Sequence, residues 1–212
     1  MANEKHLYCG KTDLDLSEKG RADLLKKNSA SKLSGAGLAL NETFGQSESI
    51  YEKIIFPDIS HCKIFTSGMK RTNQTLSLLY PDLANSAIEE RSFRELDFGD
   101  FEMKSYDELK DDESYRAWVQ GEVDRIQAGL TEFKDNPCPN GESWLKMTER
   151  VLAALEKAVK FANSIAIFTH GGVISAIMQH FFPNERKSIY EWQPNFGEGY
   201  RILLRGEPVA EN

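Results

Sequence analysis

The sequence predicts an α/β fold in which helices cover both faces of a mostly parallel sheet, giving a three-layer α/β/α sandwich. The first observation is that short apolar segments alternate with amphipathic ones along the 212 residues. The second is that the strands expected at 63–67 and 164–170 each lead directly into a helix. We expect one domain over residues 1–212, because this length suits a single domain.

The expected elements follow from periodicity and from breaker residues. The clearest helix is 141–162, whose apolar side chains recur on one face at Trp144, Met147, Val151, Leu155 and Val159. Residues 28–60 are rich in Ser, Gly and Asn at first, which indicates a loop or insertion with room for one short helix. The remaining expected helices are 17–27, with Ser17 as N-cap, then 69–80, 105–120 and 171–182, and the expected strands are 63–67, 87–91, 164–170 and 199–205.

Composition excludes several classes of partner. The chain has 26 basic and 33 acidic residues and a formal net charge of −7, which argues against a broad surface for nucleic acid or anionic membranes. No apolar run reaches transmembrane length, and we find no signal peptide. The three cysteines Cys9, Cys62 and Cys138 are odd in number and widely spaced, which indicates reduced thiols in a cytoplasmic protein. A homodimer is compatible with the sequence, which does not fix the oligomeric state.

Thr169-His170-Gly171-Gly172 follows an apolar strand and precedes a helix. Ligands of such sheets collect at the carboxyl ends of strands, and the free N–H groups of the next helix favour an anion. We therefore expect His170 to act on a phosphate rather than to cap a turn. His61 and His180 lack this context and are expected at the surface or in packing, and His6 stays undecided.

Arg71 lies in the first turn of a helix that also follows a strand. An arginine can bind two phosphate oxygens at once, which a lysine cannot do. An arginine on an exposed helix is common, so this residue gains weight only beside the strand of His170.

Glu95 follows an expected strand and is flanked by Phe93 and Leu96. Apolar surroundings raise the pKa of a carboxyl group, so that it can serve as a proton donor. Glu102 and Glu108 are alternatives, although for Glu108 we expect an ordinary solvated acid.

The segments that contain Arg71, Glu95 and His170, in this order along the chain, resemble those of the histidine phosphatase superfamily. The resemblance to this superfamily and its phosphoglycerate-mutase-like fold covers essentially the whole chain. Residues 67–75, SGMKRTNQT, resemble the S-P-L-x-R-x-x-Q-T segment of the family, with Gly68 in place of the usual proline. Phe93-Arg94-Glu95 resembles L-x-E, and the G-E-S before a long helix is found at 141–143. The turn at His170 resembles the S-H-G-G turn of the family.

The resemblance implies hydrolysis of a phosphomonoester through a phosphohistidine, without a metal or cofactor. It implies that Glu95 protonates the leaving oxygen and that Arg71 and His170 stabilise the phosphate, together with Asn3 and the backbone at Gly171. Cys9 and Gly10 would line the phosphate entrance.

Two further segments resemble α-ribazole-5′-phosphate phosphatases: N-x-x-x-L-Y-x-G at residues 3–10 and F-G-D-F-E-M at residues 98–103. They imply α-ribazole 5′-phosphate as substrate, in cobalamin biosynthesis. A phosphoglycerate mutase and a catalytically inactive phosphate-binding relative are the alternatives.

Asn3 matches the asparagine that ends the R-H-G-x-T-x-x-N motif of the family, so that the motif's histidine and its strand would fall before Met1. Residues 1–212 would then lack the phosphorylated histidine and would be inactive alone. Either the natural protein begins upstream or this is a truncated relative. We favour the first interpretation, because every other site residue is in place.

Overall fold

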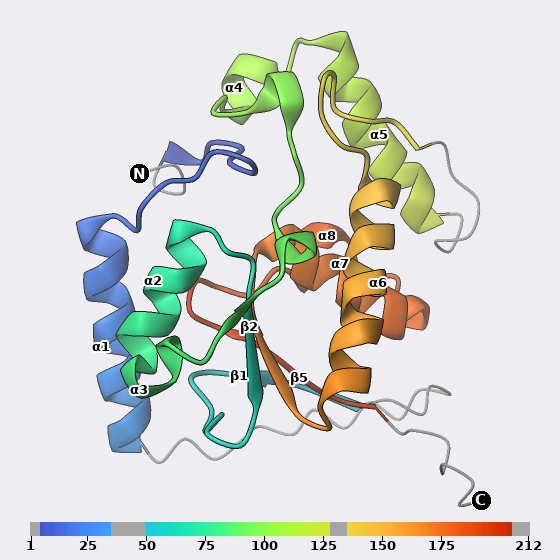
Figure 1. The fold of residues 1–212 in the computed structure, drawn as a ribbon. Helices are drawn as coiled ribbons and strands as arrows, with labels where there is room; N and C mark the ends of the chain where they lie inside the picture. Colours follow the sequence, from blue (N-terminus) through green and yellow to red (C-terminus); the bar gives the residue numbers. More distant parts are fainter. Residues whose placement is uncertain (1–4, 35–49, 128–134, 205–212) are drawn as a thin grey trace, which may run out of the picture.

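The computed structural model describes residues 5–34, 50–127 and 135–204, and it confirms an α/β fold (Figure 1). The strands are β1 (Ile50–Ile54), β2 (Lys63–Thr66), β3 (Ile88–Glu89), β4 (Ile165–Phe168) and β5 (Gly199–Leu203). The α-helices are α1 (Glu18–Ser34), α2 (Lys70–Leu79), α3 (Pro81–Ala84), α4 (Tyr106–Leu109), α5 (Glu113–Gln127), α6 (Trp144–Phe161), α7 (Gly171–Phe181) and α8 (Ile189–Trp192). Short 3₁₀ turns η2 (Arg91–Phe93), η3 (Gly99–Phe101) and η4 (Pro183–Glu185) complete these elements.

The strands form two sheets. Strands β3, β2 and β4 lie side by side and parallel, in that order, with Phe65 opposite both Ile88 and Ile167. Strands β1 and β5 pair antiparallel in a separate ribbon. Within the described residues β4 pairs with β2 alone, and its four residues are half-buried. The sequence predicted a buried strand here, and the difference follows from the unpaired edge.

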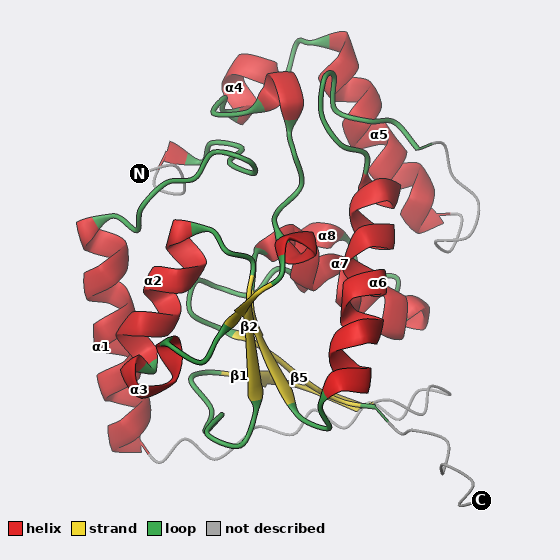
Figure 2. Cartoon of the chain, viewed as in Figure 1, coloured by secondary structure: helices red, strands yellow, loops and turns green. Residues whose placement is uncertain are grey.

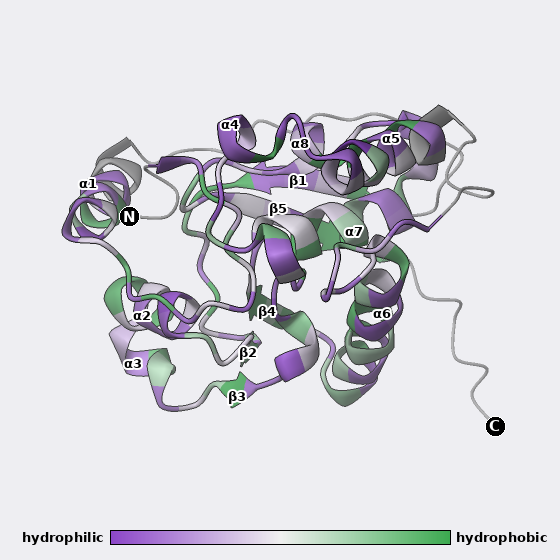
Figure 3. Ribbon diagram, turned by 90° about the horizontal axis from the view of Figure 1, so that it is seen from above, coloured by the Kyte–Doolittle hydropathy of each residue, from purple (hydrophilic) through white to green (hydrophobic). Residues whose placement is uncertain are grey.

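Helices lie on both sides of the parallel strands. Helices α1, α2 and α3 lie on one side of β2, and α6 lies on the other (Figures 1 and 2). The largest core cluster fills the space between α6, α7 and the sheet, and Phe93, Met147, Val151 and Val173 within it are fully buried. Helix α7 is drawn largely in the hydrophobic colour in Figure 3, in agreement with the many buried residues along it. The carboxyl ends of β2 and β4 are thereby fixed next to each other.

Helix α6 confirms the expected long helix, with one correction on its buried face. Ser143 caps it by accepting the N–H of Lys146, and Met147, Val151 and Leu155 are buried as predicted. Val159 is 37 % exposed, and Ala158 is buried in its place. Each step of four residues turns about 40° past a full turn of the helix, so a strict four-residue spacing moves off the buried face.

Three other expectations need correction. Residues 28–34 continue α1, and Ile50–Ile54 forms β1, so the segment 28–60 is not simply a loop or insertion; residues 35–49 lie outside the described part. The helix expected at 105–120 divides into α4 and α5, because the carboxylate of Asp112 accepts the N–H of Ser114 and begins a new helix. The strand expected at 87–91 is only two residues long.

Candidate active site

His170 lies where β4 ends and α7 begins, and it is only 8 % exposed. Its Nδ1 accepts a hydrogen bond from Arg71 Nε at 3.1 Å, and its Nε2 lies 2.8 Å from Ser67 Oγ. Because Nδ1 is an acceptor, the proton of the ring is on Nε2 and is donated to Ser67. Burial, together with the nearby charge of Arg71, lowers the pKa of His170 well below its ordinary value. The imidazole is therefore neutral at neutral pH.

Arg71 lies in the first turn of α2 and faces the same site. Besides its bond to His170, its two terminal nitrogens donate to the carbonyl oxygens of Thr12 and Gly10, each at 2.9 Å. Three of the five N–H groups of the guanidinium are thus used inside the protein. The other two N–H groups remain for a ligand, so Arg71 can bind an anion through only part of its guanidinium group.

The turn between β2 and α2 explains the glycine that replaces the family's usual proline. Gly68 has a φ of +73°, a backbone conformation that proline cannot adopt because its ring fixes φ near −65°. The turn places Ser67 under the ring of His170, and the Ser67 hydroxyl in turn contacts the hydroxyl of Thr72. Ser67 is therefore a positioning residue that the sequence analysis quoted but did not assign to the site.

Glu95 is held against the first turn of α7. One carboxylate oxygen accepts the N–H of Gly172 and the other accepts the N–H of Leu96, both at 3.0 Å. A Cβ at Gly172 would come within 2.3 Å of the carboxylate, so this close approach requires glycine. Burial raises the pKa of Glu95, although the two backbone N–H groups and the charges of Arg71 and Arg150 act in the opposite direction. A carboxyl group with a raised pKa is suited to donate a proton.

Arg150 supports Glu95 from behind and was missed by the sequence analysis. Its five N–H groups donate to five acceptors: both carboxylate oxygens of Glu142 and the carbonyl oxygens of Ser92, Arg94 and Glu95. It therefore has no donor left for a ligand and braces the segment that carries Glu95. An arginine next to the buried Val151 on an amphipathic helix is the signal that could have identified it.

The two alternative acids have other tasks. Glu102 accepts hydrogen bonds from the N–H groups of Gly10 and Thr12. It thereby stabilises the turn whose carbonyl oxygens accept hydrogen bonds from Arg71. Glu108 is exposed and caps α4 by accepting the N–H of Ser105, which lowers its pKa. Neither carboxylate is directed to the site in the way that Glu95 is.

The other predicted site residues are placed as follows. The carbonyl oxygen of Gly10 accepts a hydrogen bond from Arg71. Gly171 is the first residue of α7, and a Cβ there would point toward the side chain of Gln193. Cys9 is half-buried and its thiol contacts the carbonyl of Thr12; burial raises the pKa of this thiol, which disfavours the thiolate. Asn3 lies outside the described residues. His6, His61 and His180 are exposed, as expected for the last two.

Among the residues that the structure describes, no three His, Cys, Asp or Glu side chains gather as metal ligands would. No helix in the described ranges has the length and apolar character needed to cross a bilayer.

The sequence profile of the histidine phosphatase superfamily (branch 1) matches residues 46–198, which is more than half of the chain. The chain therefore belongs to this superfamily. No curated protein sequence matches it significantly.

Solved structures show the same fold. A proposed α-ribazole-5′-P phosphatase of Escherichia coli is 17 % identical with a TM-score of 0.64, over 98 % of this chain and 91 % of that protein. YhfR of Bacillus stearothermophilus is 20 % identical with a TM-score of 0.59, over 92 % and 80 %. A phosphoglycerate mutase of Thermus thermophilus is 23 % identical with a TM-score of 0.52, over 84 % and 76 %. At these identities the likeness extends to the fold alone.

Proposed function

We propose that this protein hydrolyses phosphomonoesters through a phosphohistidine, with Glu95 as the acid. The observation that carries the proposal is the placement of Glu95: a carboxyl group with a raised pKa, near the charge of Arg71 and bonded to the N-terminus of α7, which His170 directly precedes. Family membership supports the same chemistry. The remaining N–H groups of Arg71 and the start of α7 at Gly171 would hold the phosphate oxygens.

In the first step a histidine nitrogen attacks phosphorus, the P–O bond to the leaving group breaks, and Glu95 gives its proton to the leaving oxygen. In the second step water attacks phosphorus, the N–P bond breaks, and Glu95 takes a proton from the water. The neutral His170 donates from Nε2 to the phosphate if it exchanges Ser67 for a phosphate oxygen.

We infer that none of the histidines in the described residues is the attacking one. His170 has both ring nitrogens engaged, and the other three histidines are exposed. This observation favours a second candidate, a non-catalytic phosphate-binding relative, for residues 1–212 alone.

For the substrate we propose α-ribazole 5′-phosphate, hydrolysed to α-ribazole in the cytoplasm for cobalamin biosynthesis. The support is the two motifs at residues 3–10 and 98–103, together with the similar fold of the E. coli protein. Phosphoglycerate is the competing substrate, since a phosphoglycerate mutase has the same fold.

The test uses protein purified from its own organism, with its intact mass measured, beside the chain of residues 1–212. Release of free phosphate from α-ribazole 5′-phosphate and trapping of an acid-labile phosphoprotein are expected in the native protein. Isomerisation of phosphoglycerate without phosphate release would favour the mutase. Absence of both reactions and of phosphoprotein would overturn the catalytic proposal and favour the binding relative.

A further inference from the structure

A cleft of about 410 Å³ opens on the side of Glu95 that faces α6 and η2. Ten residues line it, and none of them has an aliphatic or aromatic side chain. Five of them are basic and three are acidic, although the whole chain carries a net charge of −7. Such an excess of basic side chains suits a small anion.

Four of these eight charged residues form ion pairs with one another. Arg150 is paired with Glu142 and has used all its donors. Lys11 is paired with Asp97 at 3.1 Å. These four residues therefore contribute little net attraction to a ligand.

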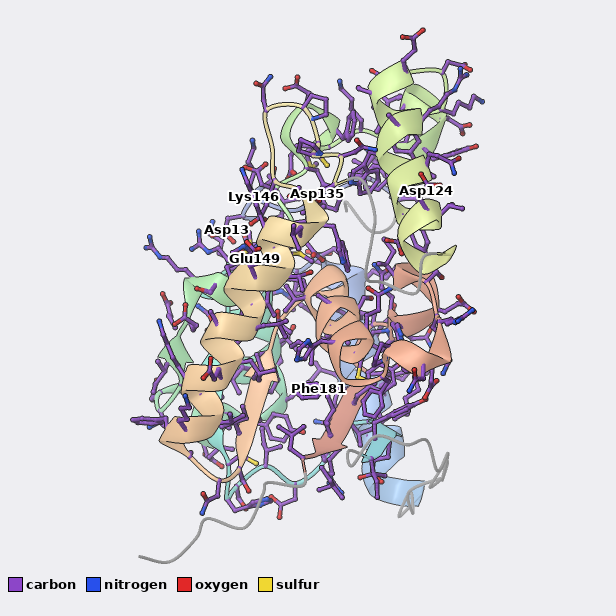
Figure 4. The ribbon with its side chains drawn as sticks, turned by 90° about the vertical axis from the view of Figure 1, so that its right-hand side faces the viewer. Asp13, Asp124, Asp135, Lys146, Glu149 and Phe181 are labelled. Atoms are coloured by element: carbon purple, nitrogen blue, oxygen red, sulfur yellow. The ribbon has the colours of Figure 1, made fainter. Side chains whose placement is uncertain are left out.

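Three cations of the cleft remain uncompensated. Within the described residues the side chains of Arg91 and Lys146 have no hydrogen-bond or ion-pair partner, and Arg94 uses only its Nε, which donates to the carbonyl of Ser67. Lys146 extends from the first turn of α6 (Figure 4). Glu95 is the acid left among them, and a carboxyl group with a raised pKa repels an anion less than an ionised one does.

We propose that this cleft is a second anion-binding site, which takes a tetrahedral phosphate group between Arg91, Arg94 and Lys146. It adjoins the site at Arg71 through Glu95, which lines the cleft, whereas Arg71 does not. Arginine side chains bind phosphate oxygens in pairs, and the lysine adds a point charge. The group is either free inorganic phosphate or a phosphate carried by a larger molecule. The proposal goes beyond the proposed function and does not depend on turnover.

The test measures binding of inorganic phosphate to residues 1–212 at low ionic strength by calorimetry. The double variant Arg91→Gln with Lys146→Met removes two exposed cations that the fold does not use. We expect its affinity to fall about tenfold, and binding by the unaltered chain to weaken in 0.5 M salt. The matched control is Lys110→Met with Lys157→Met, which makes the same change in net charge outside the cleft and is expected to change affinity less than about twofold.

An Arg71→Gln variant separates this proposal from the proposed function, because phosphate binding in the cleft should persist in it. A sugar bisphosphate distinguishes the two sources of the group. Much tighter binding than that of inorganic phosphate, lost in the double variant, would identify a larger ligand, and equal binding would identify the free ion. Unchanged affinity in the double variant, an equal loss in the control pair, or complete loss of binding in Arg71→Gln would overturn the proposal.

Discussion

The site around Arg71 and His170 and the cleft beyond Glu95 are both basic. They differ in whether the basic side chains already have hydrogen-bond partners within the protein. At Arg71 the guanidinium donates to two backbone carbonyls and to the ring of His170, whereas in the cleft Arg91 and Lys146 have no partner among the described residues. The difference teaches that a basic residue near a candidate site can serve the fold or the ligand. Hydrogen-bond partners, rather than charge alone, distinguish the two.

The largest effect is expected at Arg150, which lines the cleft but has no free donor. Arg150→Met should lower the free energy of unfolding by about 3–5 kcal/mol, because it leaves a largely buried Glu142 and three carbonyls without their donor. Urea unfolding measures this loss. The control is Arg116→Met, whose ion pair with Asp111 is exposed and should contribute less than about 1 kcal/mol. Equal losses of unfolding free energy in the two variants would contradict the proposed stabilising role of Arg150.

The comparison itself is tested by Arg71→Ala beside Arg91→Ala. The first should cost about 2–3 kcal/mol of unfolding free energy, because it removes three hydrogen bonds to a charged group. The second should stay within about 0.5 kcal/mol, as is usual for an exposed residue without partners. If the two losses were similar, the division into occupied and free cations would fail.

A comparison of Gly172→Ala with Gly171→Ala tests whether the carboxylate of Glu95 lies against Gly172. A Cβ at residue 172 would meet the carboxylate at 2.3 Å, so we expect a loss of about 1–3 kcal/mol. At residue 171 it would meet only the side chain of Gln193 at 3.1 Å, which can move, and alanine is the better helix former. Thermal unfolding should therefore rank Gly172→Ala clearly below Gly171→Ala; the reverse order would place Glu95 elsewhere.

The pH dependence of stability is the smallest expected effect. The pKa of His170 is lower in the folded than in the unfolded state, so stability is lost as pH falls below the unfolded value of about 6.5. The slope is at most about 1.4 kcal/mol per pH unit. The pKa of Glu95 is raised by folding, so its contribution falls as pH rises and partly offsets that slope. The free energy of unfolding, measured from pH 7.5 down to 4.5, should change more steeply with pH in Glu95→Gln and less steeply in His170→Asn. Identical slopes in all three proteins would contradict these protonation states.

The elements that the sequence predicted well are those whose pattern is local. Helix α6 has a long amphipathic repeat and a serine cap, and His170 and Arg71 each follow a strand that leads into a helix. Strand β1 was missed because its pairing with β5 joins residues about 150 positions apart, which no local pattern records. The bonds of Arg150 were invisible for the same reason, since its carbonyl acceptors belong to residues 92–95.

The central claim is that Glu95 is the proton donor, and its most direct test is the leaving-group dependence of Glu95→Gln in the native protein. Esters with poor leaving groups need the proton, so their hydrolysis should slow by about 10²–10⁴-fold. p-Nitrophenyl phosphate has a leaving oxygen that hardly needs protonation, and its hydrolysis should slow far less. Phosphate release from both substrates gives the two ratios. A large difference between them is the predicted result, and equal slowing of both would show that Glu95 binds the substrate without donating a proton.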